Sequence, residues 1–409
     1  MTRPKYSIAL PTLNGGETLS VTLPAMLQID RDDVEWVISN NLSEDDTKDV
    51  VLGFDDKRIR YVEPPERLHH SRHLEFAYTN ATGLWQGHMG DDDILFPSRF
   101  DVLDEVMKNT DAMVIRGGNL RYHWPEYPVP EQANHIDPCA FNGALYEMSA
   151  RDFVTNQIND IIIYGGASWA VHRSIIDKVR HRCGHFVSPR NVEFFAMRAA
   201  AAASNKIALL GLPIYVLGRH SGSTGSQALY PKNEATRNDW DWKLEFPEPW
   251  PHCPFNYHGY APISLDAAMG AAHHFPEIKE YVDLRWDFWL QRVHADIERL
   301  IRVGRLPENA RSFFDEGMAK LPEFARRQWE LRKSPDKLAE YNQAIDYRPP
   351  TPAPPLPTSD PQNNPGTTAY FGWPRSINGD DVGVRGIVDV PRWVENTYGG
   401  FFASRTVPF

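Results

Sequence analysis

The chain has 409 residues, more than one hydrophobic core usually serves, so two or three structural units are expected. Its content of 42% hydrophobic and 12% aromatic residues excludes a disordered chain. The 43 Lys and Arg residues against 54 Asp and Glu residues give a net charge of −11. That balance argues against nucleic acid as a partner, because binding to a phosphate backbone depends on cationic side chains.

The three cysteines, Cys139, Cys183 and Cys253, lie far apart and outside any Cys-x-x-Cys pattern. They predict a reducing compartment and no disulfide framework. The N-terminus enters an apolar strand within a few residues, without the apolar core of a signal peptide before it. No apolar run approaches the roughly 20 residues that span a bilayer. We therefore expect a cytoplasmic protein with no transmembrane segment.

Short apolar runs alternate with helical patterns through the first two hundred residues. This order predicts an α/β fold, with a mostly parallel sheet between layers of helices. In such sheets ligands bind beyond the carboxyl ends of the strands, here residues 11–16, 40–46 and 90–93. The expected strands are 6–10, 34–39, 59–62, 84–89 and 113–116, and the expected helices are 17–28, 43–53, 71–81 and 98–108, with Ser43 and Ser98 as N-caps.

The pattern changes further along the chain. Helices are expected at 172–180 and 192–204 and strands at 207–210 and 214–217, and an irregular connector rich in tryptophan and proline follows residue 230. Residues 276–344 are helical in pattern, with Ile278, Val282, Leu290, Val293, Ile297 and Ile301 as one apolar stripe. Between residues 349 and 365, eight of seventeen residues are proline, which predicts an extended linker. The tail after it is expected to dock onto the body or onto a partner subunit.

These changes divide the chain into four parts. Residues 1–110 and 111–228 form two halves of the α/β unit. Residues 229–346 are the aromatic connector and a helical C-terminal region, and residues 347–409 are the proline-rich linker and tail.

The strongest chemical signal is Gly90-Asp91-Asp92-Asp93-Ile94-Leu95-Phe96-Pro97, at the end of an apolar strand. Three adjacent carboxylates repel one another, and a bound cation offsets that repulsion. Carboxylate oxygens are hard ligands that suit Mg²⁺ or Mn²⁺, which also bind phosphate oxygens. The alternative interpretation is a solvated acidic turn that leads into the next helix.

Four motifs occur in a fixed order: Ile8-Ala-Leu-Pro-Thr-Leu-Asn14, Val37-Ile-Ser-Asn-Asn-Leu-Ser-Glu-Asp-Asp-Thr47, Ser71-Arg72 and the aspartate motif. Over roughly residues 5–225 this order resembles the family 2 glycosyltransferases of the GT-A fold. The resemblance implies a Rossmann-like GT-A sheet with a helical C-terminal extension. It also implies a nucleotide-diphosphate-sugar donor, with uridine as the family default, and a divalent metal.

The resemblance also implies roles for single residues. Thr12 and Asn40 would contact uracil, Asp91 the ribose and Asp93 the metal, with Arg72 near the base or the diphosphate. The family usually has Asp where this chain has Asn40, although an amide can still bond a pyrimidine edge. Further candidate donor-binding residues are Pro11, Asn14, Glu17, Asn41, Asp92 and Arg219.

Two later stretches complete the expected site. The family keeps a catalytic carboxylate just before a helix, and Glu193 is the single carboxylate in residues 188–198, which makes it the candidate base. If Asn191 occupies that position instead, the site lacks its base. In related enzymes a histidine completes the metal shell, which makes His220 a candidate ligand beside Asp91 and Asp93. The alternative for His220 is a surface position in a polar loop.

The leading hypothesis is therefore an enzyme that moves a sugar from a UDP-sugar to an acceptor hydroxyl, with inversion and with Mn²⁺ or Mg²⁺ as cofactor. The acceptor would be a saccharide, a small molecule or a protein, and the C-terminal region could serve homo-oligomerisation. One alternative is a catalytically inactive GT-A-like protein that binds nucleotides or acts as a scaffold. Another is a serine hydrolase with Ser168 as nucleophile, which leaves the three aspartates unexplained.

Overall fold

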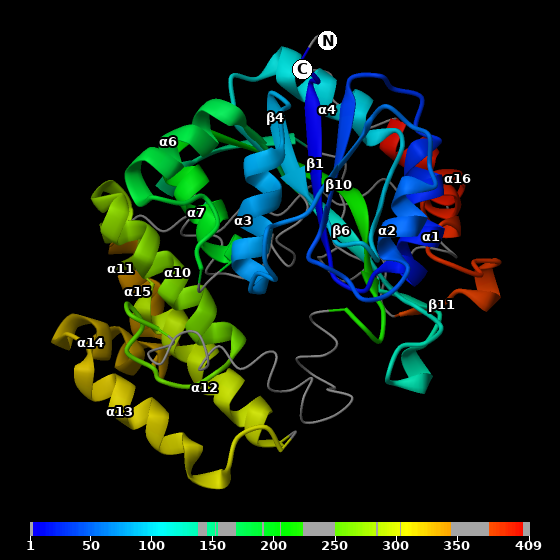
Figure 1. Ribbon diagram of the computed structural model, residues 1–409. Coiled ribbons are helices and arrows are strands. Elements are labelled where there is room, and N and C mark those ends of the chain that lie inside the picture. The colour runs from blue at the N-terminus through cyan, green and yellow to red at the C-terminus, as the bar shows by residue number, and fades with distance from the viewer. Residues whose placement is uncertain are drawn as a thin grey trace.

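The computed structural model describes residues 3–137, 145–151, 153, 169–189, 192–204, 206–223, 250–283, 285–302, 304–344 and 376–403. Within these ranges a single mixed sheet of eleven strands runs through the body (Figure 1). The strands are β1 (Tyr6–Thr12), β2 (Val34–Asn40), β3 (Ile59–Val62), β4 (Trp85–His88), β5 (Ile94–Leu95), β6 (Val114–His123), β7 (His135–Asp137), β8 (Leu145–Ser149), β9 (Trp169–His172), β10 (Lys206–Arg219) and β11 (Ile377–Asn378). Their main order is β11-β7-β6-β9-β4-β1-β2-β3, and β10 pairs with β5, β6 and β8.

The N-terminal half of this sheet is parallel. Strand β1 pairs with β2 and β4, and β2 pairs with β3. All seven residues of β1 are buried or half-buried, as expected for a parallel strand that is covered on both faces. Beyond β4 most pairs are antiparallel, although β10 and β6 run parallel. The prediction of a mostly parallel sheet thus describes the first half of the α/β unit, and the second half is mixed.

Strand β10 joins two strands that the sequence predicts as separate. Its pairing with β6 shifts register between Leu209 and Pro213 and again between Pro213 and Tyr215. Proline has no N–H for a ladder hydrogen bond, so an irregularity at Pro213 is expected within a continuous strand.

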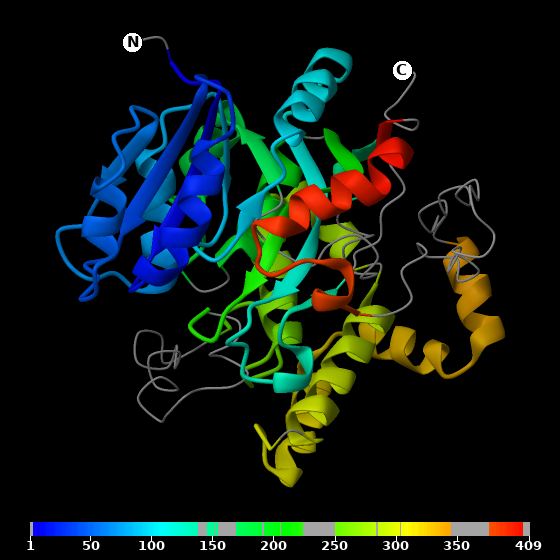
Figure 2. The ribbon, with the colours of Figure 1, turned by 90° about the vertical axis from the view of Figure 1, so that its right-hand side faces the viewer.

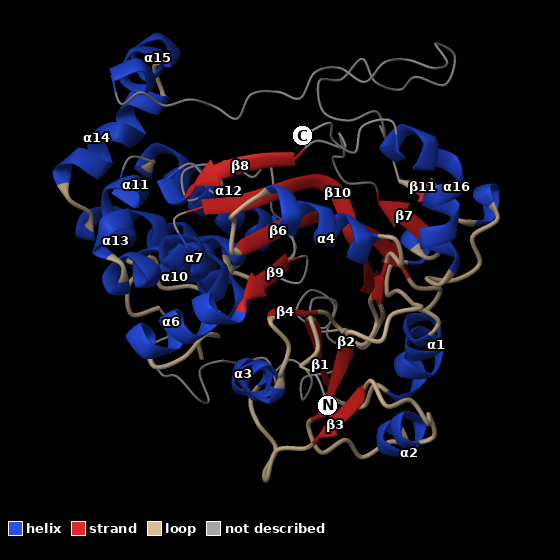
Figure 3. Cartoon of the chain, turned by 90° about the horizontal axis from the view of Figure 1, so that it is seen from above, coloured by secondary structure: helices blue, strands red, loops and turns tan. Residues whose placement is uncertain are grey.

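Helices cover both faces of the sheet. Figure 3 shows α1 (Gly16–Leu27) and α2 (Thr47–Leu52) on the side of β1–β3 opposite to α3 (His70–Asn80). Helix α4 (Arg99–Asn109) shares a hydrophobic core with α1 and α2. Helices α6 (Arg173–Cys183) and α7 (Val192–Ser204) share a second core with α3. This two-sided cover confirms the predicted α/β class.

The start of α2 differs from its prediction. The helix begins at Thr47, and the hydroxyl of Ser43 instead accepts a hydrogen bond from the backbone N–H of Asn14, 2.8 Å away in the neighbouring loop. Ser98 does precede α4, but its hydroxyl donates to Glu395 and does not cap the helix. Both side chains have long-range partners, which a local capping rule cannot foresee.

Helices of the C-terminal region pack beside α7. They are α10 (Tyr260–His274), α11 (Lys279–Asp283), α12 (Trp286–Arg302), α13 (Ser312–Lys320), α14 (Glu323–Arg332) and α15 (Pro335–Ala344). Helix α10 lies in the segment that the sequence predicts to be irregular. On the predicted stripe, Leu290, Val293 and Ile297 are buried on α12. None of the helices in the described ranges is long and apolar enough to cross a bilayer.

The C-terminal segment docks onto the body. Strand β11 pairs antiparallel with β7, and helix α16 (Asp389–Ala403) lies across the body, in red in Figure 2. Val384, Ile387, Val390 and Val394 are buried in the core that α1 and α4 share. The segment that follows the proline-rich stretch therefore completes the same core as the first hundred residues.

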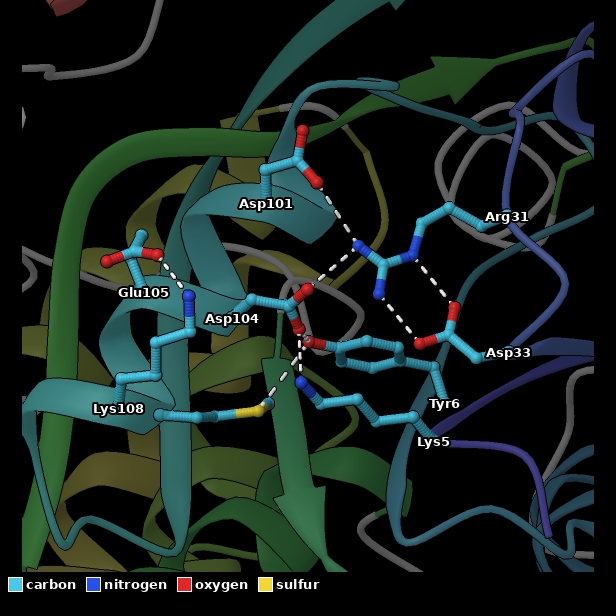
Figure 4. Close-up of polar contacts among 9 residues, drawn as sticks. Lys5, Tyr6, Arg31, Asp33, Asp101, Asp104, Glu105 and Lys108 are labelled. Carbon is cyan, nitrogen blue, oxygen red and sulfur yellow. Dashed lines mark hydrogen bonds and ion pairs between the residues drawn. The ribbon is translucent and has the colours of Figure 1, made fainter. Parts of the chain in front are cut away.

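A network of ion pairs and hydrogen bonds lies at the amino end of β1 (Figure 4). The guanidinium of Arg31 lies 2.7 Å from Asp33, 2.9 Å from Asp104 and 3.2 Å from Asp101. The buried hydroxyl of Tyr6 donates to the other oxygen of Asp104. Burial by itself raises the pKa of Asp104, but hydrogen bonds from Lys5, Tyr6 and Arg31 outweigh it and hold this pKa below its usual value.

The substitution Asp104→Asn should lower the free energy of unfolding by about 1.5–3 kcal/mol at pH 7, because it weakens hydrogen bonds to a charged acceptor. A carboxyl with a depressed folded pKa stabilises the fold above its unfolded pKa of about 3.9, and this contribution is lost as the pH falls through the folded pKa. In urea unfolding, the variant should therefore have a lower free energy of unfolding than the wild type at pH 7, and the two values should agree near pH 2. Asp101→Asn, whose side chain is 87% exposed, is the matched control and should have little effect. An equal loss at both pH values would contradict the role of the charge.

The substitution Ile387→Ala should cost about 2–5 kcal/mol, because it leaves a cavity in the core beside α4. Ile387 is 1% exposed, whereas its neighbour Val388 is 38% exposed, so Val388→Ala should cost less than about 0.5 kcal/mol. Denaturant unfolding of both variants measures the difference. If neither variant changed the free energy of unfolding, the C-terminal segment would not dock in solution.

Candidate functional site

The aspartate motif forms a turn between β4 and β5, and Asp93 fastens this turn to the end of β10. One oxygen of the Asp93 carboxylate accepts from the backbone N–H of Gly90 at 2.8 Å, and the other accepts from Gly218 at 2.8 Å. The side chain is 2% exposed. The two halves of the sheet therefore meet at one buried carboxylate.

Asp91 and Asp92 extend from this turn in different directions. Asp91 is half-buried and accepts from the hydroxyl of Thr12 at the end of β1. Asp92 is 7% exposed and accepts from the backbone N–H of His220 at 3.4 Å. The backbone carbonyl of Asp92 accepts from the indole N–H of Trp124 at 3.2 Å. Of the three carboxylates, that of Asp91 is the most open to a ligand.

The three carboxyl groups are hard to ionise together. Burial raises the pKa of Asp91 to about 6 and that of Asp93 to about 7. Burial, with the charges of Asp93 and Asp91, raises the pKa of Asp92 well above its usual value. A cation near the turn would favour the ionised forms, which is the electrostatic condition that the sequence predicts for a metal-binding turn.

The loops after β1 and β2 interlock beside this turn. Asn14 donates from its backbone N–H to Ser43, and its side-chain oxygen accepts from the backbone N–H of Glu44 at 2.9 Å. Asn14 and Leu42 both have positive φ angles, of 54° and 57°. For a leucine this is a strained backbone conformation, and such strain gathers at sites where geometry matters. The ends of β1 and β2, which are predicted to hold the nucleoside, are thus joined by hydrogen bonds between their loops. Pro11 lies at the same edge of the sheet.

Asn40 and Asn41 are buried and hold neighbouring parts of this edge. The amide of Asn40 donates to the hydroxyl of Tyr61 at 2.9 Å. The side chain of Asn41 donates to the carbonyl of Leu68 at 2.7 Å and accepts from the N–H of Leu68 at 2.8 Å. Both amides therefore have structural partners in addition to the predicted contact with the donor.

The cationic and histidine candidates come from α3 and from the end of β10. Arg72 is exposed in the first turn of α3, and Arg219 is half-buried at the end of β10. The Nδ1 atom of His220 accepts from the N–H of Gly222 at 3.1 Å, which in a neutral ring leaves the proton on Nε2, 4.0 Å from the carboxylate of Glu17. Metal binding through Nε2 would require that proton to move. The role of His220 as a ligand remains a prediction.

Glu193 lies in the first turn of α7 and is half-buried. Burial raises the pKa of its carboxyl group, and the charge of Arg116 opposes this shift. Val192, just before it, has a φ angle of 43°, which is rare for a β-branched residue. Asn191, the alternative position for the base, lies outside the described residues, as does Ser168, the nucleophile of the hydrolase hypothesis.

The carboxylate oxygens of the turn suit a hard divalent cation whose remaining ligands would be phosphate oxygens. In the described part of the chain, no three His, Cys, Asp or Glu side chains gather closely enough to hold an ion by themselves. Mg²⁺ in nucleotide sites is commonly held by one or two carboxylates and by substrate phosphates, so a three-residue cage is not required. The half-buried Asp91 carboxylate and the mutual repulsion of the three aspartates agree with such a site.

Sequence reasoning missed several residues that shape the edge. The hydroxyl of Thr22 on α1 donates to the carbonyl of Asp91 at 2.8 Å, and the carboxylate of Asp45 accepts from the N–H of Gly16 at 3.0 Å. Trp124 lies far from the aspartate motif along the chain. The alternation of strands and helices signals which strands end at the edge, but it does not signal which side chains meet there.

An internal cavity of about 30 Å³ lies beneath β4, between Trp85, Phe100 and Tyr215. A volume of this size holds about one water molecule, whereas ligand pockets are roughly 300–1,000 Å³. The cavity is therefore a packing defect, and the candidate donor site is the strand edge outside it.

The substitution Gly218→Ala should disturb the aspartate turn, because a Cβ there would overlap the backbone carbonyl oxygen of Asp92. We expect a loss of about 1–3 kcal/mol in the free energy of unfolding and weaker nucleotide binding. Gly386→Ala is the matched control, since its Cβ meets no atom within 4 Å. Thermal melts and nucleotide titrations of both variants test this, and an unchanged Gly218→Ala protein would contradict the contact.

Comparison with known proteins finds a family model that matches part of the chain. Residues 7–180 match the family model "Glycosyl transferase family 2". No curated protein matches the chain. Among solved structures, S. aureus TarS 1-349 in complex with UDP-GlcNAc is similar at 14% identity with a TM-score of 0.45, over 84% of this chain and 93% of that chain. A mycobacterial protein is similar at 16% identity with a TM-score of 0.37, over 56% of this chain and 70% of that chain.

The family match covers β1–β4, the aspartate turn, β6 and most of α6, so it includes the ends of β1 and β2 and the aspartate turn, whereas β10 lies outside it. This agrees with the α/β sheet and its two layers of helices. Residues 7–180, which are less than half of the chain, therefore match glycosyl transferase family 2, and this match supports a glycosyltransferase.

Proposed function

We propose that this glycosyltransferase moves a sugar from a UDP-sugar to an acceptor hydroxyl, with inversion at the sugar and with Mg²⁺ or Mn²⁺ as cofactor. The observation that supports this most directly is the meeting of Thr12, Asp91 and Asp93 at the carboxyl ends of β1, β4 and β10. In α/β sheets this is the edge at which nucleotides bind.

The donor would lie along this edge. Asp91, the most open carboxylate of the turn, would accept from the ribose hydroxyls or bind the cation. The interlocked loops that carry Thr12, Asn14 and Asn41 would hold the nucleoside without a large rearrangement, because they are already hydrogen-bonded to each other. Arg72 and Arg219 are the candidate partners of the diphosphate, as bidentate cations.

Asp91 and Asp93, with His220, are the residues proposed to hold the cation, and Asp92 supports the turn between them. When bound, the cation would act as a Lewis acid that stabilises the departing diphosphate. The hydrogen bonds from the N–H groups of Gly90 and Gly218 would hold the Asp93 carboxylate in place beside the cation.

Glu193 is the proposed base. It would take the proton from the acceptor hydroxyl while that oxygen forms a bond to the anomeric carbon and the bond to the diphosphate breaks. A single displacement of this kind inverts the configuration. Burial raises the pKa of Glu193 toward working pH, which suits a general base better than a fully solvated glutamate.

Three wider assignments belong to the same proposal. The acceptor is a saccharide, a small molecule or a protein, and we infer a cytoplasmic setting from cysteines that include the two free thiols of Cys183 and Cys253. A homo-oligomer formed through the C-terminal region remains a proposal as well. The division of the chain at residues 110, 228 and 346 also remains a prediction.

The decisive experiment pairs binding with turnover. UDP should bind the wild type only with Mn²⁺ or Mg²⁺ in a calorimetric titration, and Asp93→Ala should lose this binding. Glu193→Gln should keep UDP binding but lower kcat by roughly 100- to 10,000-fold in a screen of UDP-sugars and acceptors. Because the ionised carboxylate is needed, kcat should rise with pH through the raised pKa of Glu193.

Glu147→Gln on β8 removes the same charge at a side chain that is 45% exposed, and it should leave kcat unchanged. Metal-dependent UDP binding without turnover on any donor and acceptor would favour an inactive nucleotide-binding protein. If another nucleotide binds and UDP does not, the donor assignment is wrong and the family assignment stands.

A further inference from the structure

The side chain of Asn40 bonds other residues of the protein through both its nitrogen and its oxygen. Its amide nitrogen donates to the hydroxyl of Tyr61 at 2.9 Å and to Glu63 at 3.3 Å, and its oxygen accepts from the N–H of Ser43 at 3.0 Å. Asn40 is 1% exposed. The Tyr61 hydroxyl and the accepting oxygen of Glu63 lie 2.5 Å apart, so Asn40 bonds both of them from one side of its amide, and its burial leaves little room for a base to reach it.

Glu63 is the carboxylate that Asn40 and Tyr61 hold at this edge. One of its oxygens accepts from both of them, and the other accepts from Lys48 at 3.3 Å. The side chain is 29% exposed, so a ligand can reach it. The hydrogen bond from Tyr61 and the charge of Lys48 lower the pKa of Glu63, which keeps the group ionised at neutral pH.

Strand register places this carboxylate in the row of donor-binding candidates. Thr12 is opposite Asn40, and Val62 of β3 is opposite Ser39 of β2. Glu63, one residue further, continues the row that begins at Thr12. The row follows the carboxyl edge of the parallel strands, where nucleotides bind.

We propose that Glu63 recognises the base of the donor nucleotide by accepting its ring N–H, and that Asn40 and Tyr61 position this carboxylate. The inference rests on the proposed function and assigns Asn40 a supporting role in place of the direct contact with uracil that the family resemblance implies. It restores a carboxylate to an edge at which this chain lacks the usual aspartate.

The hydrogen-bond capacity of Glu63 selects the base. One oxygen already accepts two bonds and the other accepts one, so a single accepting position remains among the contacts of the described residues. Uracil presents one ring N–H, at N3, between two carbonyl groups. Guanine presents two adjacent N–H groups that would need both oxygens, and cytosine carries a lone pair at N3. The carboxylate therefore fits uracil.

The test compares UDP and CDP binding, with Mn²⁺, in the wild type and in two variants. Glu63→Gln places an amide N–H against N3–H of uracil, so UDP affinity should fall about 10- to 100-fold, the range of one hydrogen bond to a charged group. CDP affinity should fall less or rise, because that amide can donate to N3 of cytosine. Asn40→Asp should also weaken UDP, because it puts a second carboxylate beside Glu63 and removes a donor to it.

The Asn40 variant distinguishes recognition by Glu63 from a direct contact of residue 40 with uracil. A direct contact with N3–H predicts tighter UDP binding in Asn40→Asp, whereas recognition by Glu63 predicts weaker binding. Glu147→Gln is the matched control: it removes the same charge on β8, away from this edge, at a side chain that is 45% exposed, and should leave UDP binding unchanged. Thermal melts confirm that each variant is folded.

Unchanged UDP affinity in Glu63→Gln would overturn the inference and leave the proposed function intact. A wild type that binds no uridine nucleotide would overturn both.

Discussion

The hydrogen bonds from Gly90 and Gly218 to the two oxygens of Asp93 are the contact on which the candidate site depends. They join the end of β4 to the end of β10, two strands that are far apart in the sequence. Because this carboxylate is buried, its position is set by the backbone on both sides. Asp91 and Asp92 are then presented from one rigid turn, with Thr12 on one flank and Trp124 on the other.

This arrangement is costly in the absence of a ligand. Three carboxyl groups with raised pKa values stand in one turn, and Leu42 nearby keeps a strained backbone conformation. Such costs persist where the surrounding structure enforces them, and they are common at binding sites. A bound cation would relieve the electrostatic part.

The N-terminal half of the sheet also packs against a segment far along the chain. Ser98 directly follows the aspartate motif, and its hydroxyl donates to Glu395 at 2.6 Å on α16. On the other face, α7 carries Glu193 and packs against α10 of the helical region, where Arg198 bonds Ser264. The helix that carries Glu193 is thus supported by the C-terminal helices.

The sequence alone determined the class of the fold and the edge at which chemistry is expected. Strand β3 and helix α7 have the bounds that the pattern predicts, since alternation and apolar periodicity are local properties. Helix α10 was missed because it is buried on most sides and shows no polar face. The docking of α16 was left open, because nothing local specifies which surface an apolar segment covers after a long proline-rich stretch.

The partners of side chains were decided only by the tertiary structure. Ser43 bonds Asn14 instead of capping a helix, Asn40 is engaged by Tyr61 and Glu63, and His220 is directed by Gly222. Each of these contacts joins neighbouring strands or the loops at their ends, so it depends on strand register and loop geometry. The residue types predict which chemistry is available at the edge. Which atom faces the ligand follows only when distant segments are brought together, because a hydrogen bond requires a defined distance and direction.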